Sequence, residues 1–233
     1  MAGETGAAAS KGRLFIVATP VGNLEDVTLR ALRILGEVEA VACEDTRQTL
    51  KLLNKYQLRK RLISYYHPHE GRKIPEIIGL LMSGRDVALV SDAGTPGISD
   101  PGFPLIREAL KEGVQVVPVP GPSAVAAALS ASGLPTHRFL FAGFPPPKKG
   151  GLRKLLQSLH EEEATLVFYL PTRRVLEFLE AVVATLGDRR VVIARELTKI
   201  HEEFIRGTAA DLLNSLEKRP LKGEATVLVE GLR

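Results

Sequence analysis

The chain has a single cysteine, Cys43, and this scarcity excludes a disulfide framework and a zinc site built from several thiolates. A protein without disulfides suits a reducing compartment, so we expect a cytoplasmic location. Long apolar runs are missing as well, and the N-terminus lacks the hydrophobic core of a signal peptide. We therefore expect no membrane-spanning segment and no membrane partner.

Motifs for several common enzyme classes are also missing. The first candidate ligand loop, Thr19–Asn23, holds one glycine where a dinucleotide fingerprint requires three. No P-loop motif and no Gly-x-Ser-x-Gly elbow occur, which counts against P-loop phosphotransferases and serine hydrolases. His67 and His69 lie two positions apart beside Glu70, but no third ligand follows at a spacing typical of a metal site. We therefore predict that the protein holds no metal.

The composition that remains is that of a globular α/β protein. Of the 233 residues, 45% are hydrophobic and 25% are charged, which suits a substantial core in one large or two small domains. The formal net charge is +4, from 31 Lys and Arg against 27 Asp and Glu. This surplus fits an anionic partner such as nucleic acid, although many soluble enzymes are equally basic.

Short apolar runs alternate with helical patterns along the chain. Five such strand–helix pairs precede Ser132–Thr136, a break rich in turn-forming residues, and the alternation is typical of a parallel sheet with helices on both faces. The second half restarts at Phe139 and ends in strands that can pair antiparallel, which gives a mixed sheet. We predict the fold class α/β, with two α/β domains over residues 13–134 and 135–233 after a disordered leader over residues 1–12.

The most informative stretch is a long loop after the apolar run Val87–Val90. Ser91–Gly102 is rich in glycine and proline, and it takes about ten residues where such connections usually take two to six. In open α/β sheets, ligands bind at the carboxyl ends of the strands, where glycine lets the backbone approach a ligand closely. We therefore interpret Ser91–Gly102 as a ligand loop.

Charged residues follow another strand end at the same predicted edge of the sheet. Glu44–Arg47 comes directly after the predicted strand Val38–Cys43. A helix cap at Asp45 with Arg47 as its ion-pair partner explains these two residues as well as a catalytic role does. Both interpretations stay open.

Among the basic clusters of the chain, two in the second half begin a predicted helix. One holds Lys148, Lys149 and Arg153 after a Phe-Pro-Pro-Pro turn, and the other holds Arg173 and Arg174 at the start of a predicted helix. Each cluster alone is typical of a solvated surface. Together they are candidates to contact phosphates from the rim of an interdomain cleft.

Four motifs in a fixed order add a family resemblance: Glu44–Arg47, Asp92–Gly102, Val119–Ala124 and Ala194–Lys199. From about Leu14 to Val229, the sequence resembles the tetrapyrrole-methylase-like S-adenosylmethionine enzymes. Within them it is similar to the branch that methylates the ribose 2′-hydroxyl of a decoding-centre cytidine in 16S ribosomal RNA. The resemblance implies S-adenosylmethionine as cofactor in a cleft between two domains, 16S rRNA or the small ribosomal subunit as partner, and a homodimer.

The resemblance also assigns cofactor residues by position. The implied cofactor-binding residues lie on three loops of the first domain and on two strands of the second: Pro20, Val21, Asp92, Gly94, Ile98, Ser123, Ala124, Leu170 and Ala225. The candidates for a general base that activates the ribose hydroxyl are Glu44, Asp45 and His67. The candidates for RNA contacts are Arg47, Lys148, Lys149, Arg153, Arg173, Arg174 and Lys199.

The sequence departs from such relatives at three places. Tyr169-Leu170 stands where Tyr-Glu is common, His67–Gly71 reads His-Pro-His-Glu-Gly in place of His-x-His-Asn-Glu, and the sequence stops at Arg233 where many relatives continue into a helical extension. Two alternatives stay open. One is a methyltransferase of the same superfamily that acts on a tetrapyrrole or another small acceptor, such as a modified histidine. The other is a non-catalytic RNA-binding module of ribosome assembly.

Overall fold

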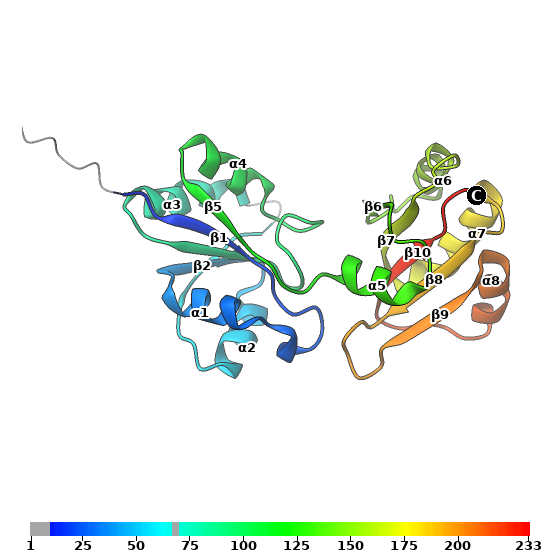
Figure 1. The fold of residues 1–233 in the computed structure, drawn as a ribbon, viewed down its shortest axis with the longest axis horizontal. Coiled ribbons are helices and arrows are strands. Elements are labelled where there is room, and N and C mark those ends of the chain that lie inside the picture. Colours follow the sequence, from blue (N-terminus) through cyan, green and yellow to red (C-terminus); the bar gives the residue numbers. More distant parts are fainter. Residues whose placement is uncertain (1–9, 67–69) are drawn as a thin grey trace, which may run out of the picture. The chain divides into compact units, whose positions relative to one another are not determined.

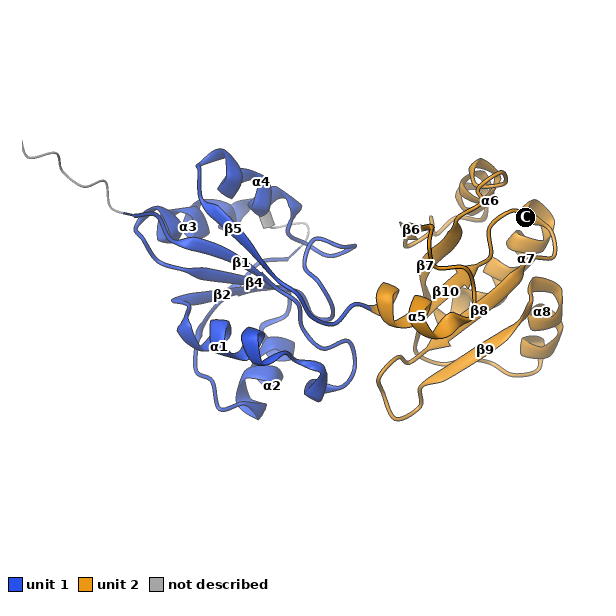
Figure 2. Cartoon of the chain, in the orientation of Figure 1, with its two compact units in different colours: residues 1–123 blue, residues 124–233 orange. Residues whose placement is uncertain are grey.

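The computed structural model describes residues 10–66 and 70–233. It divides the chain into two compact units, Met1–Ser123 and Ala124–Arg233, hereafter unit 1 and unit 2 (Figure 2). Each unit is a sheet flanked by helices, so the predicted α/β class is confirmed. In the part of the chain that the structure describes, no helix has the length and apolar character needed to cross a membrane.

The division between the units differs from the predicted position. The break at Ser132–Thr136 suggests a boundary after residue 134, whereas the units divide between Ser123 and Ala124. The reason is helix α5 (Ala124–Ser132), whose apolar side packs in one hydrophobic cluster with strands of unit 2. A small-residue helix is apolar nearly all round, so its sequence does not indicate which sheet it covers.

The predicted leader over residues 1–12 lies largely outside the described residues, but its last residues do not fit the prediction of disorder. The Gly12 N–H donates to the Leu81 carbonyl at 2.7 Å. Lys11 Nζ donates to the Glu112 carbonyl at 2.6 Å. The ordered chain therefore begins before the first strand.

Replacing Gly12 with alanine is expected to lower the free energy of unfolding by about 2 kcal/mol. A Cβ at this position would lie 2.1 Å from the Arg85 carbonyl oxygen, so the backbone has to shift. Urea unfolding measures the change. Gly79→Ala is the matched control, because a Cβ there meets nothing within 4 Å. An unchanged stability of Gly12→Ala would show that the chain is free at this position.

The sheet of unit 1 has the strand order β3-β2-β4-β1-β5 over the described residues (Figure 1). Its strands are β1 (Arg13–Val17), β2 (Ala40–Cys43), β3 (Arg61–Ser64), β4 (Val87–Val90) and β5 (Gln115–Val119). The helical segments between them are η1 (Leu24–Asp26), α1 (Leu29–Glu37), α2 (Thr46–Lys55), α3 (Glu70–Met82) and α4 (Phe103–Lys111). All strand pairs are parallel, as predicted, so the carboxyl ends of the strands meet at one edge.

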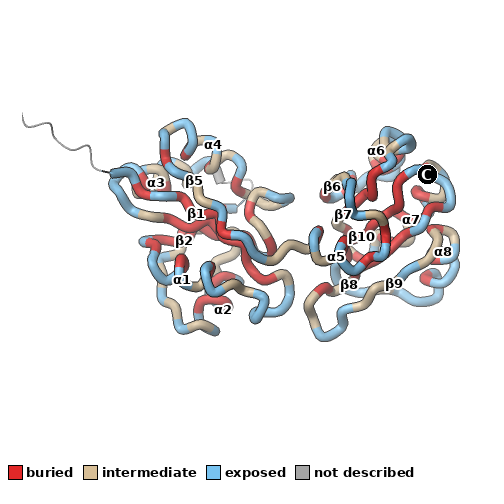
Figure 3. The backbone as a smooth tube through the Cα atoms, in the orientation of Figure 1, coloured by how far each residue is buried: buried red, intermediate tan, exposed pale blue. Residues whose placement is uncertain are grey.

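Helices cover both faces of this sheet. α1 and α2 pack on one face and α3 and α4 on the other, each pair in its own hydrophobic cluster. The central strands are consequently buried along their whole length (Figure 3). This double burial explains why β2 and β4 are continuous apolar runs in the sequence and not alternating ones.

Unit 2 holds a mixed sheet in the order β6-β7-β10-β8-β9, as far as the described residues extend. Its strands are β6 (Phe139–Gly143), β7 (Thr165–Pro171), β8 (Arg190–Arg195), β9 (Glu203–Thr208) and β10 (Glu224–Val229). β6 and β7 are parallel and the other pairs antiparallel, which confirms the predicted mixed sheet. One face carries α6 (Lys149–Ser158), α7 (Val175–Leu186) and α8 (Ala209–Glu217), and the other carries α5. The short helix η2 (Thr172–Arg174) directly precedes α7.

Candidate functional site

A backbone bridge joins two strand ends of unit 1. The Thr19 N–H donates to the Gly94 carbonyl at 2.8 Å, and the Gly94 N–H donates to the Thr19 carbonyl at 2.9 Å. The Thr19 hydroxyl adds a buried bond to the Ser91 carbonyl at 2.9 Å. These bonds tie the loop after β1 to the loop after β4. They thereby hold the two predicted cofactor loops of this edge next to each other.

Three glycines of the Ser91–Gly102 loop have a positive φ, as does one non-glycine residue, Ser99. Gly94 has φ 79° and Gly97 has φ 81°, values that favour glycine. At Gly102, with φ 150°, a Cβ would lie 3.1 Å from Leu89 Cδ2 and 3.2 Å from the Gly97 nitrogen. Glycine is therefore favoured by the backbone conformation at Gly94 and Gly97, and by both conformation and close packing at Gly102.

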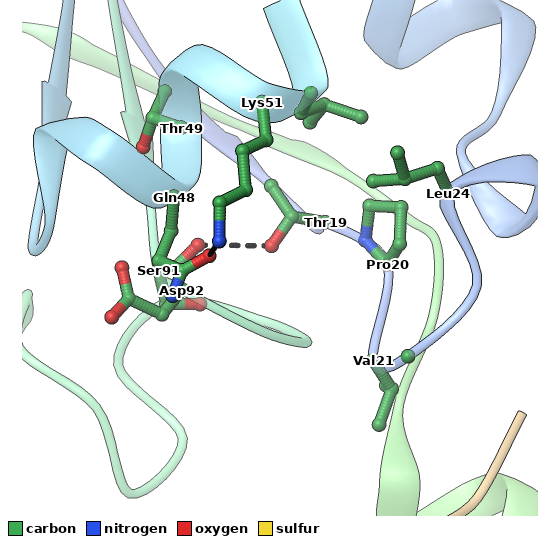
Figure 4. A pocket seen from close by; sticks show the side chains of 11 residues that line it. Thr19, Pro20, Val21, Leu24, Gln48, Thr49, Lys51, Ser91 and Asp92 are labelled. Atoms are coloured by element: carbon green, nitrogen blue, oxygen red, sulfur yellow. Dashed lines mark hydrogen bonds between the residues drawn. The ribbon is translucent and has the colours of Figure 1, made fainter. Parts of the chain in front are cut away.

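A pocket of about 250 Å³ opens at this edge of unit 1 (Figure 4). The loop after β1, the start of the loop after β4 and one side of α2 form its wall: Thr19, Pro20, Val21, Gly22, Leu24, Gln48, Thr49, Lys51, Leu52, Ser91 and Asp92. The structure thus brings together Pro20, Val21 and Asp92, three of the residues assigned to the cofactor by resemblance.

Two polar residues of this pocket escape sequence reasoning. Lys51 Nζ donates to Gln48 Oε1 at 2.9 Å, and both side chains reach into the pocket from α2 (Figure 4). They lie one turn apart on a helix, without a motif around them. Tertiary packing decides which face of α2 meets the loops. From the sequence, the spacing of three residues indicates only that the two side chains lie on the same face of the helix.

Acidic side chains gather around Asp92. Its Oδ1 accepts a hydrogen bond from the Asp45 N–H at 3.0 Å, which links the end of β2 to the loop after β4. Burial raises the pKa of Glu44, and repulsion from Asp92 and Asp100 raises it further. Burial likewise raises the pKa of Asp92. It also raises the pKa of Asp100 to about 6, although a hydrogen bond with Ser91 acts in the opposite direction. Among the described residues, no group of three or more His, Cys, Asp or Glu is arranged to hold a metal ion.

Asp45 differs from its neighbours because Arg47 neutralises it. Its Oδ1 accepts from the Arg47 N–H at 2.8 Å as the N-cap of α2, and its Oδ2 lies 2.7 Å from Arg47 Nη2. The hydrogen bonds with Arg47 lower the pKa of Asp45 to about 2. A carboxylate with so low a pKa is a weak base at neutral pH. The geometry therefore favours the cap and ion-pair interpretation of Asp45 and Arg47.

Of the other base candidates, His67 lies outside the described residues, and Glu44 is half-buried directly after β2. Asp100 is a titratable group that sequence reasoning missed, although it belongs to the Asp92–Gly102 motif. A hydrogen bond joins its carboxyl group to Ser91 at the other end of the loop, and nothing in the motif indicates this burial.

Replacing Asp100 with asparagine is expected to stabilise the protein by about 1 kcal/mol near pH 8 and to have almost no effect near pH 4. The native carboxyl has a pKa of about 6, above its ordinary 3.8, so the native state binds more protons than the unfolded state between these values. Stability is therefore lost as the pH rises through this window. The difference between the native and unfolded pKa values corresponds to at most roughly 3 kcal/mol of stability. Partial solvation of the carboxyl group reduces this effect. Urea unfolding at both pH values measures the effect, and a pH-independent difference would contradict it.

The remaining cofactor candidates lie in several settings. Gly94 is buried in the bridge, and Ile98 is exposed on the loop. Ser123 and Ala124 stand at the division between the units. In unit 2, Leu170 and Ala225 face each other across β7 and β10 and are only 1% and 6% exposed, inside the hydrophobic core. Their side chains therefore pack in the core of unit 2. The assignment of these two residues to the cofactor stays a prediction.

The basic candidates divide into exposed side chains and side chains that already bind another protein group. Lys148, Lys149, Arg153 and Arg173 are exposed. Arg174 instead donates to the Pro145 and Pro146 carbonyls, at 3.1 and 2.7 Å. Lys199 Nζ lies 3.0 Å from Glu196 Oε1, and Arg47 is paired with Asp45. The first group is therefore the better source of contacts to an anion.

Comparison with known proteins bears on the fold and on this site. Residues 13–213 match the family model described as Tetrapyrrole (Corrin/Porphyrin) Methylases. The chain belongs to the tetrapyrrole methylase family. Solved structures similar to this tetrapyrrole methylase include a cobalt precorrin-4 methyltransferase of cobalamin biosynthesis, with 19% identity, a TM-score of 0.69 and 98% of both chains covered. Another is diphthine synthase, with 16% identity, a TM-score of 0.73 and coverage of 94% and 90%. At this identity the likeness concerns the fold alone.

Curated relatives of this tetrapyrrole methylase are more similar in sequence. Ribosomal RNA small subunit methyltransferase I of Thermotoga maritima is 47% identical over 220 residues, which cover 94% of this chain and 99% of the relative. The protein of the same name from Escherichia coli O157:H7 is 45% identical over 225 residues, 95% of this chain and 79% of the relative. The family resemblance seen in the motifs is thereby confirmed.

Proposed function

We propose that this protein transfers a methyl group from S-adenosylmethionine to the ribose 2′-hydroxyl of a decoding-centre cytidine, cytidine 1402, in 16S ribosomal RNA. The observation that carries the proposal is the identity of 45–47% to proteins named ribosomal RNA small subunit methyltransferase I over almost the whole chain. The pocket and the carboxylates of unit 1 supply a site whose chemistry suits such a reaction.

The residues at the carboxyl edge of unit 1 fit a cationic methyl donor. S-adenosylmethionine supplies an activated methyl group on a positively charged sulfonium and also carries an ammonium group. Burial raises the pKa values of Glu44, Asp92 and Asp100, and repulsion from Asp92 adds to the rise at Glu44 and Asp100. A cation bound among these carboxylates would stabilise their charged forms. Pro20, Val21 and Asp92 are the residues that would hold the donor.

Glu44 is the general base that the electrostatics favour. A base with a pKa near the operating pH is the most effective, and the environment moves the pKa of Glu44 in that direction while Arg47 moves the pKa of Asp45 away from it. Positioning of the acceptor against the donor can supply about 7–11 kcal/mol. A base adds about 10²–10⁴-fold. Glu44 would accept the proton of the ribose hydroxyl on its carboxylate.

Three further parts of the proposal concern partners and location. The exposed Lys148, Lys149, Arg153 and Arg173 would contact RNA phosphates. We also propose a homodimer, which light scattering of the purified protein tests, and a cytoplasmic location, where ribosomal RNA would be met.

Mapping of 2′-O-methyl groups on 16S rRNA, with and without this protein, tests the proposal. We expect one cytidine to lose its mark in cells that lack the protein and to regain it with the wild-type gene. A mark that persists without the protein would show that the proposed function is wrong. Methylation of a small tetrapyrrole acceptor would favour another enzyme of the superfamily, and failure to bind S-adenosylmethionine in calorimetry would favour a non-catalytic module.

A further inference from the structure

We propose that Phe144 is a stacking surface for an unpaired RNA base, held in place by a rigid turn of unit 2. The turn, Gly143–Lys148, connects β6 to α6 and is called the Phe144 turn below. The inference rests on the proposed RNA substrate and adds a recognition element that the basic residues alone do not provide.

Phe144 is exposed although its neighbours are anchored. Its residue surface is 62% exposed, whereas Gly143 before it and Pro145 after it are buried. A single exposed aromatic residue is common on protein surfaces. The support around this ring is what suggests a role.

A second aromatic ring supports Phe144 from the sheet. Tyr169 of β7 meets the Phe144 ring at an interplanar angle of 60°, with 5.4 Å between centroids. Tyr169 also meets Phe141 of β6 at 67° and 4.9 Å. Edge-to-face contacts of this kind are a preferred arrangement of aromatic pairs and therefore favour one orientation of the ring. Phe144 therefore presents its remaining surface in a defined direction.

Arg174 holds the backbone of the Phe144 turn. Its two terminal nitrogens donate to the Pro145 and Pro146 carbonyls, and its side chain is only 17% exposed. The helix α6 packs closely as well, since a Cβ at Gly151 would lie 2.9 Å from Pro146 Cβ. Consecutive prolines restrict the backbone further. The turn is thus ordered before any ligand binds, which lowers the entropic cost of binding.

The charges next to the Phe144 turn indicate the class of ligand. Lys148 is the last residue of the turn, Lys149 is the first residue of α6, and Arg153 lies one turn further along that helix. No carboxylate of the described residues lies within ion-pair distance of these three cations. A ring beside unpaired cations fits a ligand with flat bases and a polyanionic backbone, which is single-stranded nucleic acid.

RNA binding measured at several salt concentrations tests the inference. The probe is a fluorescent single-stranded RNA with the decoding-centre sequence, followed by anisotropy. Phe144→Ala should weaken binding about tenfold at every salt concentration, because stacking is not electrostatic, and Phe144→Trp should preserve it. Lys148→Ala/Lys149→Ala should instead reduce the salt dependence of log K, since each phosphate contact contributes a slope of about −0.7. Phe139→Ala is the matched control, because Phe139 is 50% exposed at the opposite end of β6.

Arg174 serves as a positioning residue and provides a second test. Arg174→Lys keeps the charge but loses the paired bonds to Pro145 and Pro146, so affinity should fall with an unchanged salt slope. A purely electrostatic role predicts unchanged affinity. Thermal unfolding shows whether each variant is folded.

The outcomes separate this inference from the proposed function. If the wild-type protein methylates rRNA and Phe144→Ala binds RNA like the wild type, the inference is wrong and the function stands. If Phe144→Ala weakens RNA binding but the wild type methylates no rRNA, the function is wrong and the stacking surface stands. Wild-type protein that binds anionic lipid vesicles and not the RNA would overturn the inference.

Discussion

Replacing Glu44 with glutamine is expected to lower the rate constant of methyl transfer by about 10²–10⁴-fold while leaving the affinity for S-adenosylmethionine nearly unchanged. The amide has the same shape as the carboxyl group but accepts no proton. Burial and the charges of Asp92 and Asp100 raise the pKa of Glu44, so at neutral pH it is a stronger base than an ordinary carboxylate. Single-turnover transfer to rRNA and calorimetry with the cofactor measure the two quantities separately.

Two further variants sharpen this test. Asp45→Asn should reduce the rate less than Glu44→Gln does, because Arg47 already holds the pKa of Asp45 low. Asp100→Asn removes a charge that raises the pKa of Glu44, so the rise of the rate with pH should move to lower pH. An unshifted profile together with an active Glu44→Gln variant would exclude Glu44 as the base.

Replacing Asp92 with alanine is expected to weaken the binding of S-adenosylmethionine by about 100-fold. The side chain lines the pocket, where it supplies negative charge for a cationic donor. Its Oδ1 also accepts the Asp45 N–H at 3.0 Å, so it positions the turn after β2. Alanine removes both the charge and the tether. Isothermal titration calorimetry measures the loss.

Asp92→Asn separates these two contributions. The amide oxygen can still accept the Asp45 N–H, while the charge is gone, so we expect an intermediate loss of about tenfold. Asp211→Asn, which changes an exposed carboxylate on α8, is the matched control. Wild-type affinity in the Asp92→Ala variant would refute the assignment of the Ser91–Gly102 loop to the donor.

The fold could be predicted largely because its strands are buried on both faces. Val87–Val90 and Ala40–Cys43 are apolar runs for that reason, and parallel pairing then brings the loops after them to one edge. The helix cap at Asp45 could also be predicted from the sequence, because Asp directly before a helical pattern, with Arg two residues later, is typical of an N-cap with an ion-pair partner. Local pattern and tertiary structure agree at these positions.

Other features depend on which surfaces meet, and the sequence does not encode that locally. Gln48 and Lys51 line the pocket only because α2 turns that side toward the loops. The raised pKa of Asp100 results mainly from its burial, which only the folded loop creates. The side chain of Leu170 points into the core because β7 has helices on that face, which its position in a motif does not indicate.

The most direct measurement is transfer of a labelled methyl group from S-adenosylmethionine to purified small ribosomal subunits, followed by digestion of the RNA to nucleosides and mass spectrometry. The account predicts label in 2′-O-methylcytidine with the wild-type protein and nearly none with Glu44→Gln. Label on a nucleobase, or RNA that stays unlabelled while the protein binds the donor, would contradict it.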